Sequence, residues 1–488
     1  MSIFHHSVLS KLKPDASLYF VGIGGISMCG LAELTKAQGY NISGSDLHAS
    51  EHTEHLQQIG IPVKIGQTAA NIEQARPDLL VYSAAVPLDN PELLRARELG
   101  IPCAERGDFL GWLTREFNRV INIAGTHGKT TTTAMTSLIL LENGCEPTVH
   151  LGAQFAPFGD STVHLGKASD LLVSEACEYK RSFLHFVSTT AVILNIDGDH
   201  LDYFGTIDNV IQAFAVFADQ TRDGGDLIVP FNGPHMDQML QQLQDIRRQE
   251  GRPLPRIYTF GGKAPGGQAA QPDIYYDNLI YVKGLPHYDV IKDGQFFAHI
   301  ELNVPGLHNV MNSLAAIAAA AANGADAAIC AKVLAEYQGA EGRFTHKGNY
   351  KGAAVITDYA HHPTAARVTL EAASRVPHHK LWVVFQPLTY GRVKVLFDDF
   401  VSVLKPLADV SLVEIYSDRE KETLGMSSRL LVQAINAAGG HARFYDGYPE
   451  VHEHLKAVVK PDDMILFLGP EDVRAYGDRL VREPEAQS

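Results

Sequence analysis

The segment from Gly125 to Thr131 reads Gly-Thr-His-Gly-Lys-Thr-Thr and carries residue types that bind phosphate. It follows an apolar stretch and precedes a helical one, so loop N–H groups and the helix N-terminus can face an anion. Lys129 can then reach the β and γ phosphates of a nucleotide, and the Thr130 hydroxyl can reach Mg²⁺. The spacing is shorter than in the usual G-x-x-x-x-G-K-[ST] loop. A glycine-rich turn with a solvated lysine is the alternative interpretation, but the order strand, loop, Lys-Thr pair and helix favours a nucleotide site.

A nucleotide loop alone does not separate a kinase, a motor, a GTPase and a ligase, so the neighbouring segments must decide. Hard metal ligands follow the next two apolar stretches: Glu175, Glu178, Asn195, Asp197, Asp199 and His200. Oxygen and imidazole groups at these places are suited to holding Mg²⁺ near phosphates. Carboxylates at strand ends are also frequent solubilising caps. We favour the cap for Asp197 and Asp202, and a metal role for Glu175 and His200.

A second glycine-rich turn, Val21-Gly22-Ile23-Gly24-Gly25, follows a strand and opens a helix near the N-terminus. Such a turn lets a pyrophosphate approach backbone amides closely, and Asp46 closes the following strand. Ser27 occupies the place of the third glycine of a dinucleotide fingerprint, which makes the pattern weak support for NAD. The turn therefore predicts the pyrophosphate of a nucleotide-linked substrate, with a purely structural tight turn as the alternative.

Two further polar segments lie late in the chain, Asp358-Tyr359-Ala360-His361-His362-Pro363 and Gln386-Pro387-Leu388-Thr389-Tyr390-Gly391-Arg392. Paired histidines can indicate a metal, but adjacent turn positions point different ways and no third His or Cys follows at ligand spacing. We therefore predict no dedicated metal site there. Arg392 either holds a carboxylate or phosphate through its fork of donors or is an ordinary surface arginine.

The elements that position these motifs alternate between strands and helices, as in an α/β fold with mostly parallel sheets. Strands are predicted at 17–21, 41–46, 79–87, 119–125, 171–176, 190–196, 379–387, 408–416 and 462–469, and a strand followed by a turn is predicted at 353–363. Helices are predicted after each glycine loop, at 90–100, and as one packed helix over the alanine-rich run 313–328. The stretch 260–273 is rich in Gly, Pro and Ala and is predicted to be a loop.

With 488 residues the chain exceeds one hydrophobic core, so several domains are expected. The pattern predicts three α/β domains in series, at 1–115, 116–340 and 341–488. The formal charge of −15 offers no broad basic field, so nucleic acid is not an expected partner. The N-terminus has no apolar core of signal-peptide length, no stretch is long enough for a membrane span, and the five cysteines are scattered like reduced thiols. A cytoplasmic protein without a membrane partner is expected.

The motifs occur in the order GIGGISMCGLAEL, SGSD, AGTHGKTTTT, EACEYKRSFL, LNIDGDHLDYF, PGLHNVMNSLAA, GRF, DYAHHPT and FQPLTYGR. This series resembles the Mur ligases over about residues 18–469, and several motifs in fixed order are far more specific than any one of them. The resemblance implies an N-terminal Rossmann-like domain for a UDP-sugar, a central P-loop ATPase and a C-terminal Rossmann-like domain that closes over them. It also implies ATP-driven, Mg²⁺-dependent joining of L-alanine to the carboxylate of UDP-N-acetylmuramate through an acyl phosphate, in cytoplasmic peptidoglycan precursor synthesis.

By the same resemblance, the catalytic residues are Lys129, Glu175 and His200, and the metal ligands are Thr130, Glu175 and His200. The implied ATP-binding residues are Gly125, Thr126, His127, Gly128, Lys129, Thr130, Thr131, Asn309, Arg343 and Asp358. Substrate-binding residues are Gly22, Gly24, Gly25, Ser45, Asp46 and Ser83 on the UDP-sugar side, and Tyr359, His361 and Arg392 at the amino-acid pocket. His127 lies within the phosphate loop and is expected to face substrate.

The sequence departs from the family pattern at two places in the predicted C-terminal domain. Leu388 stands where L-alanine-adding relatives usually place a histidine, and Leu468-Gly469-Pro470-Glu471-Asp472 replaces the usual GAGD segment. These departures leave open a ligase that recycles a murein tripeptide and a paralogue that binds ATP and a UDP-sugar without catalysis. An NAD-dependent oxidoreductase would rest on the first glycine turn alone and would leave the Lys129 loop unexplained.

Overall fold

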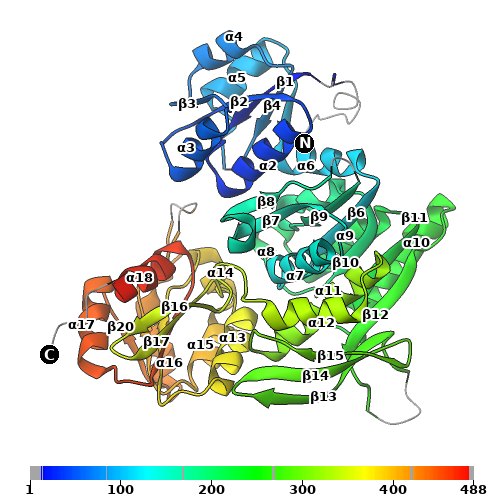
Figure 1. Cartoon of the computed structure of the whole chain (residues 1–488). Helices are drawn as coiled ribbons and strands as arrows, with labels where there is room; N and C mark the ends of the chain where they lie inside the picture. The colour runs from blue at the N-terminus through cyan, green and yellow to red at the C-terminus, as the bar shows by residue number, and fades with distance from the viewer. Residues whose placement is uncertain are drawn as a thin grey trace. The chain divides into compact units, whose positions relative to one another are not determined.

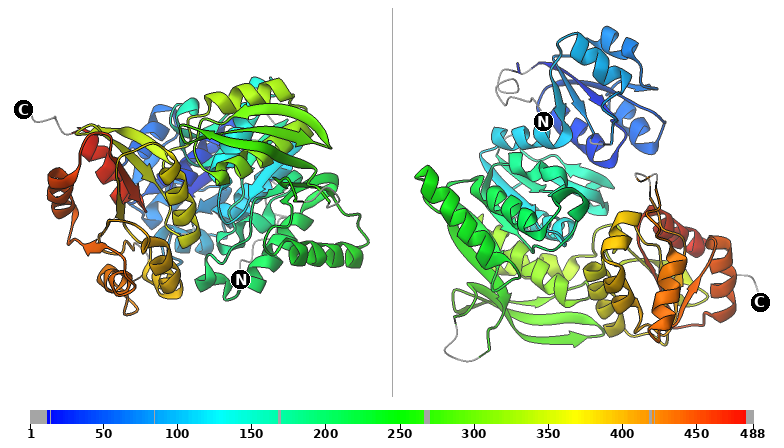
Figure 2. Two further views of the ribbon diagram at one scale, coloured as in Figure 1. Left: turned by 90° about the horizontal axis from the view of Figure 1, so that it is seen from below. Right: turned by 180° about the vertical axis from the view of Figure 1, so that it is seen from behind.

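The computed structural model describes residues 12–13, 15–83, 85–167, 170–265, 270–417, 420 and 422–482. The chain folds into two compact units, and each is described by itself. Unit 1 comprises Met1–Gly198, Thr206–Tyr275 and Ser313–Val333, and unit 2 comprises Asp199–Gly205, Tyr276–Asn312 and Leu334–Ser488. Figures 1 and 2 show the elements of both units in three views.

The N-terminal part of unit 1 contains the predicted βαβ unit, formed by β1 (Ser17–Val21), α2 (Ile26–Ala37) and β2 (Asn41–Asp46). With β3 (Val63–Ile65), β4 (Leu79–Tyr82) and β5 (Cys103–Glu105) these strands form a parallel sheet in the order β3-β2-β1-β4-β5. Helices α4 (Ala69–Ala75) and α5 (Pro91–Glu98) cover one face, and α2 and α3 (Glu51–Gln58) cover the other (Figure 1). The order reverses beside β1, so the turn after β1 lies at the switch point where such sheets bind ligands.

The central sheet of unit 1 has the order β12-β11-β10-β6-β9-β7-β8, parallel except for the pair β7–β8. Its strands are β6 (Arg119–Ala124), β7 (Thr148–Phe155), β8 (Ser161–His164), β9 (Leu171–Glu175), β10 (Ser188–Ile193), β11 (Thr221–Pro230) and β12 (Arg256–Gly262). The helices α7 (Lys129–Glu142), α9 (Ile207–Asp219) and α10 (Met236–Glu250) follow β6, β10 and β11 along the chain. β6 is almost wholly buried, as expected for the apolar, β-branched strand of a covered parallel sheet.

The alanine-rich run does not form the single helix predicted over 313–328. α11 spans Leu307–Ala322 and α12 spans Ala327–Glu336. The break follows from Asn323-Gly324, because Gly324 takes a φ of +96° and its N–H bonds to the carbonyl of Ala321, which ends the helix. The predicted loop 260–273 is also shorter, since residues 260–262 complete β12; residues 266–269 lie outside the described residues.

The unpredicted strands of unit 2 include three that are adjacent in sequence: β13 (Ile274–Val282, whose residues from Tyr276 onward belong to this unit), β14 (Leu285–Lys292) and β15 (Gln295–Glu301). They neighbour one another in that order, and β14 and β15 are antiparallel. The turns between them are Lys283-Gly284 and Asp293-Gly294, and all four residues have positive φ. Two successive positive-φ residues are typical of the two-residue turns that join antiparallel strands.

The C-terminal part of unit 2 is a sheet in the order β16-β17-β21-β18-β19-β20, parallel except for β16. Its strands are β16 (Thr345–Tyr350), β17 (Ala353–Asp358), β18 (Leu381–Phe385), β19 (Val410–Leu412), β20 (Ala442–Phe444) and β21 (Met464–Leu468). Alternate residues of β18 serve opposite cores: Val383 and Phe385 pack on the face that carries α13 (Pro363–Arg375), α15 (Phe397–Leu404) and α16 (Ser428–Ala437). Trp382 and Val384 pack on the face that carries α17 (Tyr448–Val458) and α18 (Glu471–Arg482). This two-sided burial explains the continuous apolar strands of the sequence.

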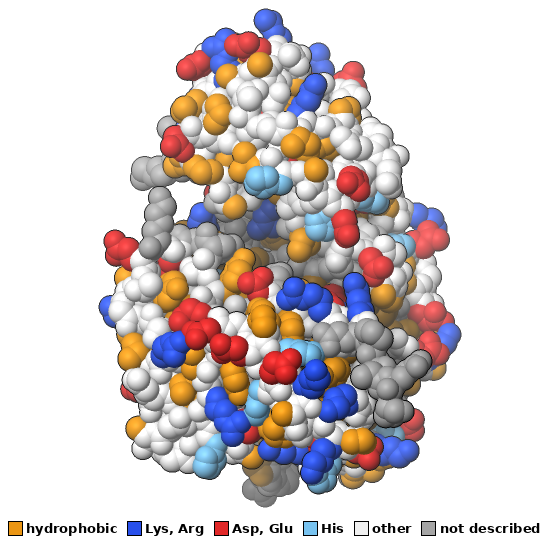
Figure 3. Space-filling view, turned by 90° about the vertical axis from the view of Figure 1, so that its left-hand side faces the viewer, with side chains coloured by type: hydrophobic (Ala, Val, Ile, Leu, Met, Phe, Trp, Pro, Cys, Tyr) orange, Lys and Arg blue, Asp and Glu red, His pale blue; other side chains and the backbone are white. Residues whose placement is uncertain are grey.

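Within the part of the chain that the structure describes, no helix is both long and apolar enough to cross a membrane. On the face shown in Figure 3, acidic and basic side chains are intermingled, and neither sign gathers into one field.

Candidate active site

The loop between β6 and α7 is built by two glycines with positive φ. Gly125 has a φ of +145° and Gly128 has a φ of +87°, a region that favours glycine. A Cβ on Gly125 would also lie 2.9 Å from Cβ of Leu194, so the loop packs against the end of β10. Gly128 is the N-cap of α7 and has no side chain to cover the first N–H groups of the helix, which is the arrangement that anion-binding helix N-termini use.

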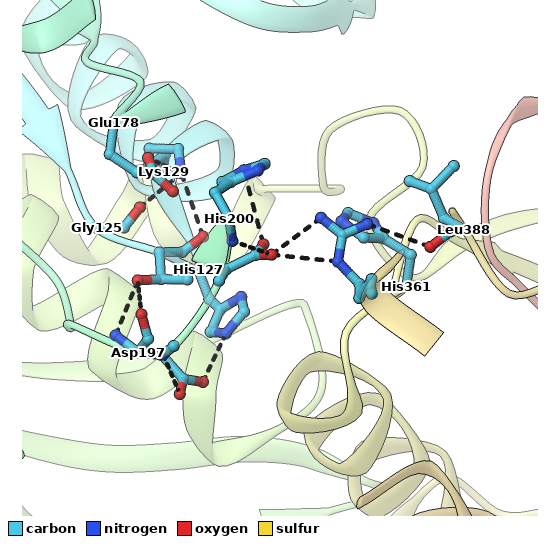
Figure 4. Close-up of polar contacts among 12 residues, drawn as sticks. Gly125, His127, Lys129, Glu178, Asp197, His200, His361 and Leu388 are labelled. Atoms are coloured by element: carbon cyan, nitrogen blue, oxygen red, sulfur yellow. Dashed lines mark hydrogen bonds and ion pairs between the residues drawn. The ribbon is translucent and has the colours of Figure 1, made fainter. Parts of the chain in front are cut away.

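The side chain of Lys129 is turned back into this loop (Figure 4). Its Nζ donates to the carbonyl oxygens of Gly125 at 2.6 Å and Thr126 at 3.2 Å, and to Oε2 of Glu178 at 2.8 Å. Burial opposes the positive charge, but Glu178 together with Cys177 and Glu175 outweighs burial and holds the pKa of Lys129 above its usual value. Glu178, predicted as a hard ligand, therefore serves in this structure as the counter-ion of the lysine.

Thr130 and Glu175, both predicted as metal ligands, are brought together in unit 1. The Thr130 hydroxyl donates to Oε2 of Glu175 at 2.9 Å, and the backbone N–H of Gly152 donates to the same oxygen at 2.9 Å. A Cβ on Gly152 would lie 2.8 Å from that oxygen, so only glycine leaves room for the carboxylate. A hydroxyl and a carboxylate that converge beside a phosphate-type loop form the all-oxygen donor set that suits Mg²⁺.

Asn195 and Asp197, which follow β10, contact the loop and hold it in place. The N–H of His127 donates to Oδ1 of Asn195, whose Nδ2 donates back to the carbonyl of His127, both at 2.9 Å. Nε2 of His127 lies 3.1 Å from Oδ2 of Asp197, and the N–H of Asp197 donates to the Thr126 hydroxyl at 2.9 Å (Figure 4). Asp197 therefore contacts the phosphate-type loop, and its role as a solubilising cap stays a prediction.

The N-terminal glycine turn gathers most of the residues predicted there. The N–H of Gly22 donates to the carbonyl of Ser45 at 2.8 Å, that of Gly25 to the carbonyl of Gly22 at 3.2 Å, and that of Gly24 to Oδ2 of Asp46 at 2.9 Å. Gly22 has a φ of +77°, and a Cβ there would lie 3.6 Å from Cβ of Ser83. The turn, Asp46 and Ser83 are thus close together at the carboxyl ends of β1, β2 and β4.

Ser45 differs from its neighbours because its side chain is fully buried. Its hydroxyl donates to Glu92 at 2.6 Å, and the same carboxylate accepts from the hydroxyl of Tyr19 at 3.0 Å and from Nδ2 of Asn71 at 2.7 Å. The sequence reading missed this hub. Glu92 lies in an ordinary helical stretch, and its partners lie 73, 47 and 21 residues away, so no local signal reveals it.

In unit 2, Arg392 is paired with Asp199 rather than exposed on the surface. Its Nε and a terminal nitrogen both donate to Oδ1 of Asp199, at 3.2 and 3.0 Å, and both side chains are about nine-tenths buried. Burial disfavours the charged Asp199, but Arg392 and the neighbouring histidines together outweigh burial and lower the pKa of that carboxyl. The neighbouring His361 is partly buried, and its removal from solvent together with Arg392 lowers its pKa to about 3 and keeps it neutral.

His200 also belongs to unit 2. It has a φ of +53° at the start of the short helix α8 (Leu201–Phe204), and its N–H donates to Oδ1 of Asp199 at 2.7 Å. Its Nε2 lies 3.8 Å from Oδ2 of the same carboxylate. Thr130 and Glu175 lie in unit 1, so a shared metal role for all three residues stays a prediction.

Asp358 organises the segment that was predicted near the nucleotide. It ends β17, and its two carboxylate oxygens accept from the N–H groups of Phe344 and Ala360, each at 2.8 Å. Burial raises the pKa of Asp358 above its usual value, with Arg343 acting in the opposite direction. The ring of Tyr359 lies close to two cations, 5.5 Å from the guanidinium of Arg343 and 5.1 Å from that of Arg474, a residue that the sequence reading missed.

Asn309, predicted to read adenine, is buried in the first turn of α11. Its Nδ2 donates to the carbonyl of Pro305 at 2.8 Å, and its Oδ1 accepts from Asn312 at 3.2 Å. His308 beside it is partly buried, and its removal from solvent lowers its pKa to about 4. Gly306 takes a φ of +100°, and a Cβ there would lie 2.5 Å from the His308 ring.

The loop from Gln386 to Arg392 is held by its backbone. The carbonyl of Leu388 accepts from Arg392 at 3.4 Å, so this contact does not depend on the type of side chain at position 388 (Figure 4). Glu420, which the sequence reading missed, accepts from the N–H groups of Tyr390 and Gly391 at the start of α14 (Tyr390–Val395). Thr389 has a φ of +63°, a strained value of the kind that concentrates at functional sites.

The other departure, at residues 468–472, keeps a tight turn at the end of β21. Gly469 has a φ of +133°, its N–H donates to the carbonyl of Asp358 at 3.0 Å, and a Cβ there would lie 2.3 Å from the carbonyl oxygen of Gln386. The changed residues therefore leave the close backbone approach between β17, β18 and β21 in place.

Comparison with known proteins identifies the class of this fold and site. Three family descriptions match in chain order: Mur ligase family, catalytic domain over residues 17–118, Mur ligase middle domain over 123–320, and Mur ligase, glutamate ligase domain over 342–470. The chain belongs to the Mur ligase family. It has the three-domain α/β fold with mostly parallel sheets that the sequence predicted, and it is an enzyme of the ligase class.

Within the family, the chain is similar to ligases named for UDP-N-acetylmuramate and L-alanine. The chain is 38% identical to the UDP-N-acetylmuramate–L-alanine ligase of Lachnospira eligens over 95% of this chain and 98% of that protein. It is 39% identical to the enzyme of the same name from Alkaliphilus metalliredigens, over 96% and 97%. Among solved structures, the UDP-N-acetylmuramate-alanine ligase of Thermotoga maritima matches with a TM-score of 0.76 and 27% identity, over 96% of this chain and 98% of that one.

Proposed function

We propose that this chain joins L-alanine to the carboxylate of UDP-N-acetylmuramate with hydrolysis of ATP to ADP and phosphate, in peptidoglycan precursor synthesis. The observation that carries the proposal is identity of 38–39% to ligases of that name along nearly the whole chain, including the region with Leu388. The geometry around Lys129 supports the same reaction. The carboxylate is activated by transfer of the γ-phosphoryl group of ATP, so the enzyme must hold the γ-phosphate in place.

The nucleotide side of the reaction is assigned to the loop Gly125–Thr131. Its N–H groups and Lys129 bind the phosphates, and Lys129 exchanges its contact with Glu178 for a phosphate oxygen. Asn309 reads the adenine, and Arg343 and Asp358 lie near the ribose and phosphates. His127 stays bonded to Asp197 and faces the substrate side of the loop.

Thr130 and Glu175 would hold Mg²⁺, since their oxygens converge within hydrogen-bond distance, and His200 would help to hold a second ion. When bound, Mg²⁺ neutralises charge on the phosphoryl group as it is transferred. The protein's own part is to aim the carboxylate of Glu175, through the donors of Thr130 and Gly152.

The two acceptors are assigned to the ends of the chain. The turn Gly22–Gly25, Ser45, Asp46 and Ser83 bind the UDP-sugar within a domain at 1–115, with Ser45 acting through its backbone and the buried Glu92 hub. Tyr359, His361 and Arg392 form the amino-acid pocket within a domain at 341–488, beyond a central domain at 116–340. Neutral His361 can accept a hydrogen bond there from the amine of L-alanine, which attacks the acyl phosphate only as the free base.

The proposal is tested by phosphate release from ATP in the presence of Mg²⁺ and UDP-N-acetylmuramate, with L-alanine, L-serine, glycine and the murein tripeptide compared. Release that depends on L-alanine, and that is lost in Lys129→Ala, supports it. Preference for the tripeptide would instead identify a recycling ligase. Silence with all four acceptors, while ATP and the UDP-sugar still bind, would identify a non-catalytic paralogue.

A further inference from the structure

The antiparallel pair β14–β15 in unit 2 presents an imidazole-rich face that the ligase reaction does not use. Its register places His287 opposite Glu301 and Asp289 opposite His299, ahead of the irregularity between Val290 and Ile291. The intervening residues Tyr288, Val290, Ala298 and Ile300 are buried. Since successive side chains of a strand point to opposite faces, the four polar residues share the other, more exposed face.

Three of these side chains converge. His287, His299 and Glu301 each offer one ligand atom, and the three atoms lie within 4.8 Å of one another. A tetrahedral metal with bonds of roughly 2.0–2.1 Å separates its ligands by about 3.4 Å. The half-exposed His299 and the exposed Glu301 have the rotamer freedom to close the remaining distance, which is at most about 1.4 Å.

Asp289, which is itself hydrogen-bonded to Asn278, orients the ring of His299. Nδ1 of His299 lies 2.8 Å from Oδ1 of Asp289, whose other oxygen accepts from Nδ2 of Asn278 at 2.8 Å. These two contacts lower the pKa of Asp289, Asn278 contributing most. A carboxylate on one ring nitrogen fixes the tautomer and leaves Nε2 for a metal, which is the arrangement found behind metal-bound histidines.

We propose that His287, His299 and Glu301 bind one late first-row divalent metal ion of the Zn²⁺ class, with Asp289 as the positioning residue of His299 and water at the fourth position. Two imidazoles and one carboxylate favour Zn²⁺, Ni²⁺ or Cu²⁺ over Mg²⁺, which prefers oxygen ligands. The site is therefore chemically distinct from the all-oxygen pair Thr130–Glu175. It joins β14 to β15, so its occupation stabilises this strand pair.

The test is equilibrium dialysis of the full chain against Zn²⁺ in excess Mg²⁺, which keeps oxygen-only sites filled. The double variant His287→Gln/His299→Gln should bind one Zn²⁺ fewer per chain than the wild type at the same free Zn²⁺. The control His441→Gln, at an exposed histidine of the same unit, should bind as many as the wild type. Equal binding by the double variant and the wild type would overturn the proposal.

A second readout locates the ion and does not depend on stoichiometry. Zn²⁺ should slow hydrogen exchange of the amides in residues 285–301 in the wild type and in His441→Gln, but not in the double variant. Asp289→Asn keeps all three ligands and should weaken Zn²⁺ binding by about 10- to 100-fold. Protection that persists in the double variant, or unchanged affinity in Asp289→Asn together with unchanged stoichiometry, would show that the metal binds elsewhere.

Discussion

Lys129 and Glu178 form a buried ion pair with 2.8 Å between Nζ and Oε2, and the lysine also donates to two carbonyls of its own loop. The ammonium group of Lys129 therefore has its hydrogen-bond partners before any nucleotide binds. Because a buried cation without a partner is costly, Glu178 keeps Lys129 charged and in place. An arriving phosphate has to compete with this carboxylate, which links nucleotide binding to the stability of the loop.

Loss of the Lys129–Glu178 ion pair should lower the stability of the protein, and bound nucleotide should reduce this loss. Glu178→Gln removes the negative charge but keeps an acceptor of similar size, so the free energy of unfolding without nucleotide should fall by about 1–3 kcal/mol. With saturating Mg²⁺ and a non-hydrolysable ATP analogue the difference from wild type should shrink, since phosphate then supplies the anionic partner. Urea unfolding in both conditions measures this. An equal loss with and without nucleotide would contradict it.

The position of the Glu175 carboxylate can be tested without removing it. Gly152→Ala would place a Cβ 2.8 Å from its Oε2, so the carboxylate must move away from Thr130. The Mg²⁺ concentration for half-maximal phosphate release should rise by about tenfold, in the range seen when the surroundings of metal ligands are disturbed. Gly261→Ala in β12 is the matched control, because its Cβ would meet Phe231 at an ordinary 3.6 Å. A Gly152→Ala enzyme with the wild-type Mg²⁺ requirement would contradict the metal assignment.

What the sequence revealed and what it hid have a common physical basis. The β6 strand, the glycines of its loop and α7 were predicted because apolar β-branched residues, positive-φ glycines and a helix follow one another locally. Glu92, Gly152 and Arg474 were missed because their roles arise only when distant strands and helices come together. The β13–β15 strands were missed although a local signal existed: Asp293-Gly294 between alternating apolar residues is typical of a hairpin. For the alanine-rich run a single helix was predicted instead of two. The high helix propensity of the whole run outweighed the local signal of Asn323-Gly324, where the first helix ends.

The Arg392–Asp199 pair predicts how the amino-acid site responds to substitution. Arg392→Lys keeps the charge but loses the two-nitrogen contact with Asp199 Oδ1, so the KM for L-alanine should rise at least about tenfold while that for ATP changes little. Leu388→Ala should keep turnover within about fivefold of wild type, because position 388 contacts Arg392 through its carbonyl. Steady-state kinetics with each substrate varied in turn checks both. A larger loss in Leu388→Ala than in Arg392→Lys would reverse the assignment.

His308 predicts a pH dependence of stability with a definite sign. Burial lowers its folded pKa to about 4, whereas an unfolded histidine titrates near 6.5. Between these two pKa values the unfolded state binds more protons than the folded state. The contribution of neutral His308 to the stability of the folded chain is therefore present above about pH 6.5 and is lost as pH falls toward 4. His308→Gln should therefore lower the free energy of unfolding at pH 7.5, yet make its decline between pH 6 and 5 shallower by about 1 kcal/mol. Urea unfolding across this range measures the slope, and a slope identical to wild type would mean that His308 takes up its proton equally in the folded and unfolded chain.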